Sequence, residues 1–151
     1  MKKIFVLLLS MLLLFGVVAC QKQESKNQQN TPSYVAYKFL KAFLQSDYEE
    51  EQRFLYEKGS YEIHKNHEKQ SIDFSPKDIE GVKEYNDKID KVIFVWIKFY
   101  NPNTHSTSTM VYAVRKNKNG DYKVDIDADI DFSSIQQKIE PKVIDPKLLG
   151  E

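Results

Sequence analysis

The chain has 151 residues, with 22 basic and 22 acidic side chains, so its formal net charge is zero at neutral pH. This balance argues against a nucleic acid partner, because binding a phosphate backbone needs a concentrated basic surface. Nine tyrosines and nine phenylalanines supply enough aromatic bulk for one compact domain and argue against an intrinsically disordered chain.

Residues 1–19 have the layout of a secretion signal. Lys2 and Lys3 form a short cationic start, and an apolar run follows from residue 4 to residue 19. This run is shorter than the roughly 20 residues that a helix needs to cross a bilayer, and polar residues follow it at once. We therefore expect the segment to be cleaved off rather than kept as a membrane span.

The end of this segment, Val17-Val18-Ala19-Cys20, resembles the lipobox of bacterial lipoproteins. In that family the cysteine thiol is alkylated with diacylglycerol, the signal is cut just before it, and an N-acyl chain can follow. The resemblance implies an exported protein that Cys20 anchors to the outer face of the cell membrane, or to the outer membrane of a two-membrane envelope. Cys20 is the only cysteine, so no intramolecular disulfide can form. The alternative is an ordinary signal with a chance cysteine.

The rest of the chain divides into three parts. Residues 20–32 are predicted to form a polar tether, because residues 21–31 carry no apolar side chain. We expect one α+β domain over residues 33–132. Residues 133–151 contain two prolines and are predicted to form a C-terminal tail with at most a short helix.

Two helices are expected at the start of the domain. Thr31-Pro32 is typical of a helix start, with a capping hydroxyl followed by proline. The apolar stripe that follows at helical spacing comprises Val35, Ala36, Phe39, Leu40 and Phe43. Ser46 and Glu49 have the spacing of a capping box for a second helix, which Gly59 would end.

A sheet is expected in the second half. The polar stretch over residues 60–86 that precedes it predicts a short helix or an irregular segment near residues 61–69 and a turn at Ser75-Pro76. Residues 92–100 form an apolar run typical of a strand buried on both faces, in which Trp96 is expected to pack. A second strand is expected over residues 107–115, followed by a hairpin turn at residues 117–120. Apolar and acidic residues then alternate over residues 122–130 and predict a third strand.

This order of elements predicts an α+β fold, with N-terminal helices packed on a curved antiparallel sheet of three to four strands. The order, and the passage from Phe39 to Tyr48 in which one helix turns into the next, resemble the cystatin-like cone fold. Nuclear transport factor two, ketosteroid isomerase and scytalone dehydratase share that fold. Its members include enzymes, small-molecule binders and non-catalytic exported modules, so the resemblance does not define a function.

Two patterns suggest a metal site, and both are better explained otherwise. Asp125-x-Asp127-x-Asp129 matches the opening of a calcium loop, but position six is Ile130 instead of glycine and position twelve is Gln136 instead of glutamate. We interpret these aspartates as the solvated face of a strand, whose like charges discourage edge pairing.

His64-x-x-His67-Glu68 is the second pattern, since residues three apart share a helix face. It lacks the histidine spacing and glutamate position of zinc peptidase motifs, so we interpret it as a solvated polar segment.

Acid/base chemistry of the cone-fold kind would need side chains such as Tyr34, Tyr37, His105 and Tyr112, but no spacing links them to a carboxylate. We therefore predict no catalytic, cofactor-binding or metal-binding residue and no cofactor besides the covalent lipid on Cys20. The sequence favours a membrane-anchored, non-enzymatic surface module that binds an envelope protein or a small ligand. The alternative is a small enzyme or solute-binding protein that uses a cone-fold cavity.

Overall fold

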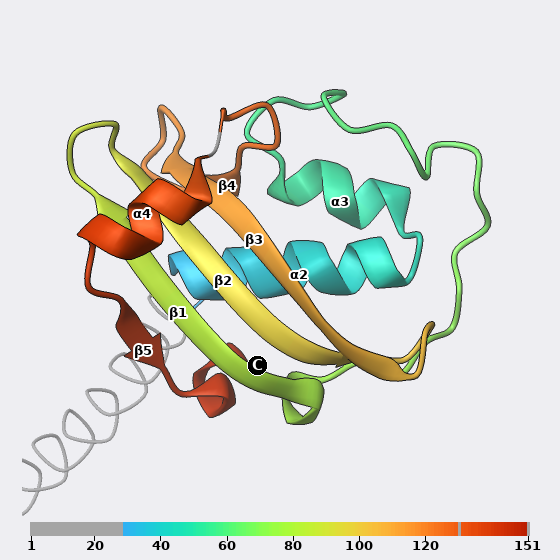
Figure 1. Cartoon of the computed structure of the whole chain (residues 1–151). Coiled ribbons are helices and arrows are strands. Elements are labelled where there is room, and N and C mark those ends of the chain that lie inside the picture. The colour runs from blue at the N-terminus through green and yellow to red at the C-terminus, as the bar shows by residue number, and fades with distance from the viewer. Residues whose placement is uncertain (1–28, 130, 151) are drawn as a thin grey trace, which may run out of the picture.

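The computed structural model describes residues 29–129 and 131–150, and the predicted signal and Cys20 lie outside these ranges. The described residues form an antiparallel sheet with helices on both faces (Figure 1). The predicted α+β class is confirmed, although the sheet has five strands instead of three to four. None of the described helices is long and apolar enough to cross a membrane.

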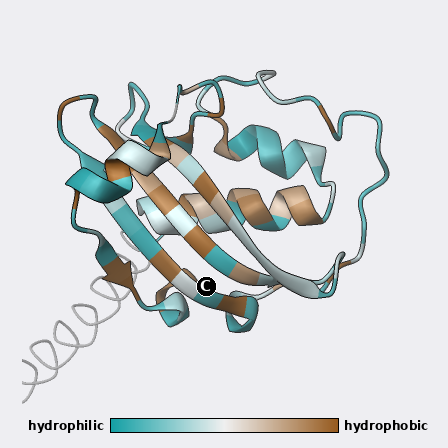
Figure 2. Ribbon diagram, viewed as in Figure 1, coloured by the Kyte–Doolittle hydropathy of each residue, from teal (hydrophilic) through white to brown (hydrophobic). Residues whose placement is uncertain are grey.

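Helix α2, Pro32–Leu44, begins where the sequence predicts. The Thr31 hydroxyl caps it by accepting a hydrogen bond from the Tyr34 amide. The predicted apolar stripe faces the sheet, where Ala36 and Leu40 are both 0 % exposed. Figure 2 shows this apolar character along α2 behind the strands. Burying such a stripe is what stabilises a helix of this length.

Helix α3, Tyr48–Phe54, is shorter than predicted and has a different cap. Asp47, not Ser46, caps it by accepting a hydrogen bond from a backbone amide of the first turn. The chain leaves the helix at Leu55 instead of continuing to Gly59, because Leu55 forms a parallel bridge with β4 and is only 3 % exposed.

The strands of the sheet are β1 (Ile79–Asp87), β2 (Val92–Asn101), β3 (Ser106–Lys116), β4 (Tyr122–Val124) and β5 (Lys142–Ile144). Their order is β4-β3-β2-β1-β5, and each neighbouring pair is antiparallel. The predicted strands at 92–100 and 107–115 are confirmed as β2 and β3. Strand β1 was not predicted, because its sequence is mostly polar and it is defined by its pairing with β2 and β5.

The strand predicted over residues 122–130 is wrong in its length, since β4 ends at Val124. The Asp125 amide still donates to the Ala113 carbonyl at 2.8 Å, and the chain then turns away from the sheet. Asp131 caps helix α4, Phe132–Lys138, by accepting a hydrogen bond from the Ser134 amide. The acidic residues therefore form a connection to a helix and not one face of a strand.

Strand β2 is covered on both faces, as the sequence predicts. Val95, Ile97 and Phe99 belong to the core that the sheet shares with α2. On the opposite face Phe94 packs in a second cluster with Tyr85, and Phe132 of α4 joins it. Figure 1 shows α2 behind the sheet and α4 in front of it.

The residues after Phe132 also belong to the packed fold. Strand β5 pairs with the centre of β1, and the short 3-10 helix η2, Pro146–Leu149, follows it. Leu149 is 1 % exposed and lies in the same core cluster as α2 and the sheet. Only three residues pair in β5, so sequence periodicity gives no signal for this strand.

Leu149→Ala should therefore destabilise the protein although it lies next to the C-terminus. We expect the free energy of unfolding in urea to fall by about 2–5 kcal/mol, the usual cost of truncating a buried leucine. The neighbouring Leu148 is 54 % exposed, and Leu148→Ala should change stability by less than about 0.5 kcal/mol. Equal effects of the two substitutions would contradict the packing of Leu149 in the core.

Candidate functional site

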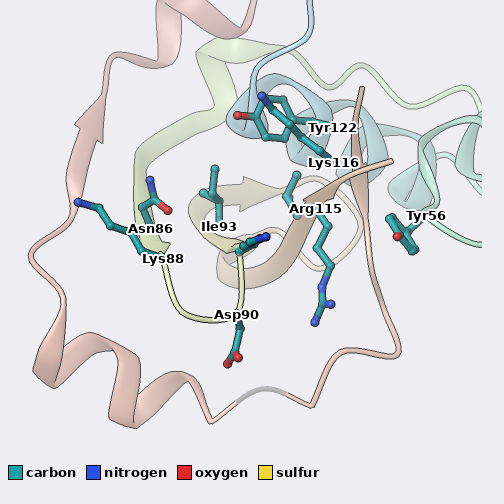
Figure 3. A pocket seen from close by; sticks show the side chains of 10 residues that line it. Tyr56, Asn86, Lys88, Asp90, Ile93, Arg115, Lys116 and Tyr122 are labelled. Carbon is teal, nitrogen blue, oxygen red and sulfur yellow. The ribbon is translucent and has the colours of Figure 1, made fainter. Parts of the chain in front are cut away.

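A pocket of about 550 Å³ opens at one end of the sheet (Figure 3). It lies where the β1–β2 hairpin approaches the β3–β4 hairpin, beside Tyr56. The lining residues are Tyr56, Asn86, Lys88, Asp90, Lys91, Ile93, Val114, Arg115, Lys116 and Tyr122. The volume lies within the range of small-molecule sites, and the lining combines apolar, aromatic and charged side chains.

The charge around this pocket is predominantly positive. Four of the lining side chains are cationic and only Asp90 is anionic. An adjoining hollow shares Lys88 and Tyr122 and adds Lys142, but it also adds Glu84 and Glu140. The excess of positive charge is therefore concentrated in the first pocket.

Local backbone geometry positions the cationic side chains. In the β1–β2 turn the Asp87 carboxylate accepts a hydrogen bond from the Ile89 amide at 2.9 Å, and Lys91 has a positive φ of 54°. Such a turn directs Lys88 and Lys91 from a short loop toward one end of the sheet. The Asn117–Gly120 turn, with Gly120 at φ 86°, similarly closes the hairpin behind Lys116.

Two of the cations are held in place by their neighbours. The Lys116 ammonium lies 5.0 Å from the centroid of the Tyr122 ring, within the range of a cation–π interaction. Arg115 Nε lies 3.0 Å from a carboxylate oxygen of Asp125, which neutralises part of its charge. Figure 3 shows Lys116 beside Tyr122 and Arg115 extending away from them. Lys88 and Lys91 are exposed and able to adjust to a ligand.

A second candidate site lies inside the domain, where Glu51 of α3 is 0 % exposed. His64 Nδ1 lies 2.5 Å from Glu51 Oε1, so the imidazole and the carboxyl group are within hydrogen-bond distance. Burial raises the pKa of Glu51, whereas the hydrogen bond with His64 acts in the opposite direction. A carboxyl with a raised pKa next to an imidazole is an arrangement that acid/base catalysis uses.

Tyr112 of β3 lies near this pair. Burial raises the pKa of Tyr112, and the charges of Tyr61 and Glu51 add to the increase. Within the described part of the chain, neither the Tyr112 hydroxyl nor Glu51 Oε2 has a hydrogen-bond partner. The Tyr112 ring packs edge-on against Phe39 of α2, with centroids 5.5 Å apart. Two unpaired polar atoms in a core are costly, so this cluster is a candidate for a function.

The two histidines of the predicted polar segment are not equivalent. The His64 side chain is only 12 % exposed because it packs on Phe43 and pairs with Glu51, whereas His67 is exposed. The prediction that the whole segment is solvated is therefore wrong for His64. No group of three or more side chains suited to hold a metal ion occurs in residues 29–129 and 131–150.

The other residues singled out from the sequence are dispersed. Tyr37 stacks on Phe74 in the core, His105 is exposed in the β2–β3 loop, and only Tyr112 of the four candidates lies near a buried carboxylate. Trp96 is partly exposed, and the Lys83 ammonium lies 5.2 Å from its ring centroid. Cys20, the predicted lipidation site, lies outside the described residues.

The sequence does not indicate Glu51 or the pocket lysines as functional residues. Glu51 follows Glu49 and Glu50, so residue type does not distinguish the buried glutamate from its neighbours. Helical spacing from the apolar residues of α3 was the one available signal, because Glu51 lies three residues after Tyr48 and four before Leu55. The lysines come from two separate hairpins, and no local pattern brings them together.

Comparisons with known proteins return no match: no family model, no curated protein and no solved structure is significantly similar to this chain.

Glu51→Gln should reduce the dependence of stability on pH. Because the pKa of Glu51 is raised in the folded state, folding favours its protonated form, and the free energy of unfolding falls as the pH rises from 4.5 through the raised pKa. Glutamine has no proton to lose, so the variant should lack this decrease. Urea titrations at several pH values measure the effect.

The exposed Glu49→Gln on the same helix is the matched control and should keep the pH dependence of the original protein. If Glu51→Gln also keeps it, the assignment of a raised pKa to Glu51 is wrong.

Proposed function

We propose that the chain is a lipid-anchored protein of the bacterial envelope whose domain is a non-catalytic binding module. The anchor is supported by the signal-like segment, by the lipobox-like residues before Cys20 and by the absence of any second cysteine. Diacylglycerol with an additional acyl chain would hold the protein stably, since each buried CH₂ contributes about 0.8 kcal/mol. The polar tether then keeps the domain off the bilayer.

The binding site of this module is the pocket at the end of the sheet, and its ligand is a small anion bearing phosphate or carboxylate groups. The observation that carries this proposal is the charge of the pocket lining. Four cationic side chains and one anionic side chain, Asp90, surround a pocket of about 550 Å³. Lysine ammonium groups bind such oxygens as point charges, and Arg115 adds planar donors. Tyr56, Tyr122 and Ile93 supply the surface for a less polar part of the ligand.

We also propose that the fold is cone-like, with α2 packed along the long strands of the sheet and α3 beside α2. The order of the elements and the position of α2 across the sheet support this (Figure 1). In such a fold the interior between helix and sheet is the usual place for a ligand. Here Phe39, Tyr112 and their aromatic neighbours occupy that interior.

The second candidate function is a small enzyme or solute-binding protein that uses this interior. The observation in its favour is the buried cluster of Glu51, His64 and Tyr112, with two polar atoms that have no hydrogen-bond partner in the described chain. A ligand or substrate would have to reach it past the segment of residues 56–75, which lies over α3 and carries His64.

Titration of the full chain in detergent with pyrophosphate and citrate, followed by calorimetry, tests the first proposal. Both anions should bind, sucrose should not, and added salt should weaken binding because the attraction is electrostatic. The double variant Lys88→Gln, Lys116→Gln should raise Kd about tenfold, since each exposed charge pair contributes up to about 1 kcal/mol.

The matched control removes the same two charges elsewhere, with Lys38→Gln and Lys41→Gln on α2, and should leave Kd unchanged. If both double variants lose affinity equally, or if neither anion binds to the original chain, the anion site is refuted. Binding that survives the pocket variants but disappears in Tyr112→Phe would favour the interior site instead.

A further inference from the structure

The edge of the sheet along β3 is largely uncovered. Strand β4 pairs with β3 only at Val114, Arg115 and Lys116. The Asp125 amide extends the contact by one hydrogen bond, to the Ala113 carbonyl at 2.8 Å. Beyond it, residues 106–112 pair with β2 on one side and with no other described strand on the other side.

The direction of the free backbone groups follows from that last hydrogen bond. The Ala113 carbonyl points away from β2, and the amide and carbonyl of every second residue in a strand point the same way. The backbone amide and carbonyl groups of Thr107, Thr109 and Val111 therefore point away from β2. Their side chains share the face of the sheet on which Ala113 packs, where Thr107 and Thr109 are exposed.

This edge lacks the features that prevent strands from pairing between molecules. Charged side chains, proline and bulges protect most exposed edges. Residues 106–113, Ser-Thr-Ser-Thr-Met-Val-Tyr-Ala, contain no charge and no proline, and their register with β2 has no irregularity. The charges of β3, Arg115 and Lys116, lie within the part that β4 already covers.

The geometry points to a second copy of this chain as the partner of the β3 edge. The two strands pair antiparallel about a two-fold axis at Thr109, so that each Thr109 faces the second copy's Thr109. Thr107 then faces the second copy's Val111, and Ser108 faces its Met110. The outward groups of Thr107, Thr109 and Val111 all find partners, and the sheet continues from one copy into the other.

A second copy satisfies the constraints of this edge. Every facing pair is uncharged, Thr–Thr and Thr–Val pairs suit a sheet, and an isologous contact closes without forming fibres. The partner strand pairs with residues 106–112. It stops before Ala113, because the Ala113 carbonyl already accepts a hydrogen bond from the Asp125 amide. The opposite edge of the sheet does not offer the same surface, because β5 is three residues long and contains Lys142.

Cross-linking of the full chain in its native membrane tests the pairing. Facing residues of a hydrogen-bonded antiparallel pair have Cα atoms about 5.5 Å apart, within the range of a disulfide. Thr109→Cys should therefore give a band of twice the chain mass on a non-reducing gel after mild oxidation. Asn119→Cys, in the exposed β3–β4 turn, is the matched control and should give none, like the original chain with Cys20 alone.

Adding Thr107→Pro to Thr109→Cys should abolish the dimer band without unfolding the protein. The Thr107 amide points outward, so proline removes a hydrogen bond of the dimer but none of the ladder with β2. An unchanged thermal midpoint confirms that the fold persists. Labelling by a maleimide shows whether the Thr109→Cys thiol is accessible. If the thiol is labelled but the dimer band is absent, the inference is overturned. A cross-link of a different mass would also overturn it, because it identifies another protein as the occupant of the edge.

Discussion

Helix α2 lies across the sheet with Ala36 and Leu40 completely buried, in one core with Val95 and Ile97 of β2. Removing this apolar surface from water is the main source of stability, and it fixes the orientation of the elements that follow. Since β2 is apolar on both faces, its second face also needs a cover. Helix α4 supplies it through Phe132, and the residues around Leu149 complete the first core from the C-terminus. Helix α2 near the start of the described chain and Leu149 near its end therefore pack in the same core against the sheet.

The two candidate sites lie in different parts of the fold, one at the open end of the sheet and one inside the domain. At the end of the sheet, the β1–β2 hairpin and the β3–β4 hairpin come together, and Lys88, Lys91 and Lys116 line the pocket there. At the side, α3 and the segment of residues 56–75 close over the core with polar contacts, among them Glu51 with His64 and the Gln52 side chain with the Tyr61 carbonyl. Aromatic side chains fill the interior, whereas the end of the sheet is open, and we therefore propose the pocket as the ligand site in preference to the interior.

The sequence predicts well where a pattern is local. The stripe in α2, the Thr31 cap and the apolar run of β2 each depend on neighbouring residues, and the structure confirms them. Strand β1 is polar and becomes a strand only through partners far away in the chain, so no local pattern indicates it. The alternation after Tyr122 predicted a long strand, but β4 ends at Val124. Asp125 pairs with Arg115, and Asp131 caps α4. Burial of Glu51 likewise depends on His64, thirteen residues later in the chain.

We propose that Cys20 anchors this domain to a membrane. Mass spectrometry of the protein extracted from the membranes of its own cells tests it most directly. We expect a mature chain that begins at Cys20 and whose N-terminal peptide carries the mass of diacylglycerol, with or without an N-acyl chain. A chain that retains Met1, that begins at another residue, or that carries an unmodified Cys20 would contradict it.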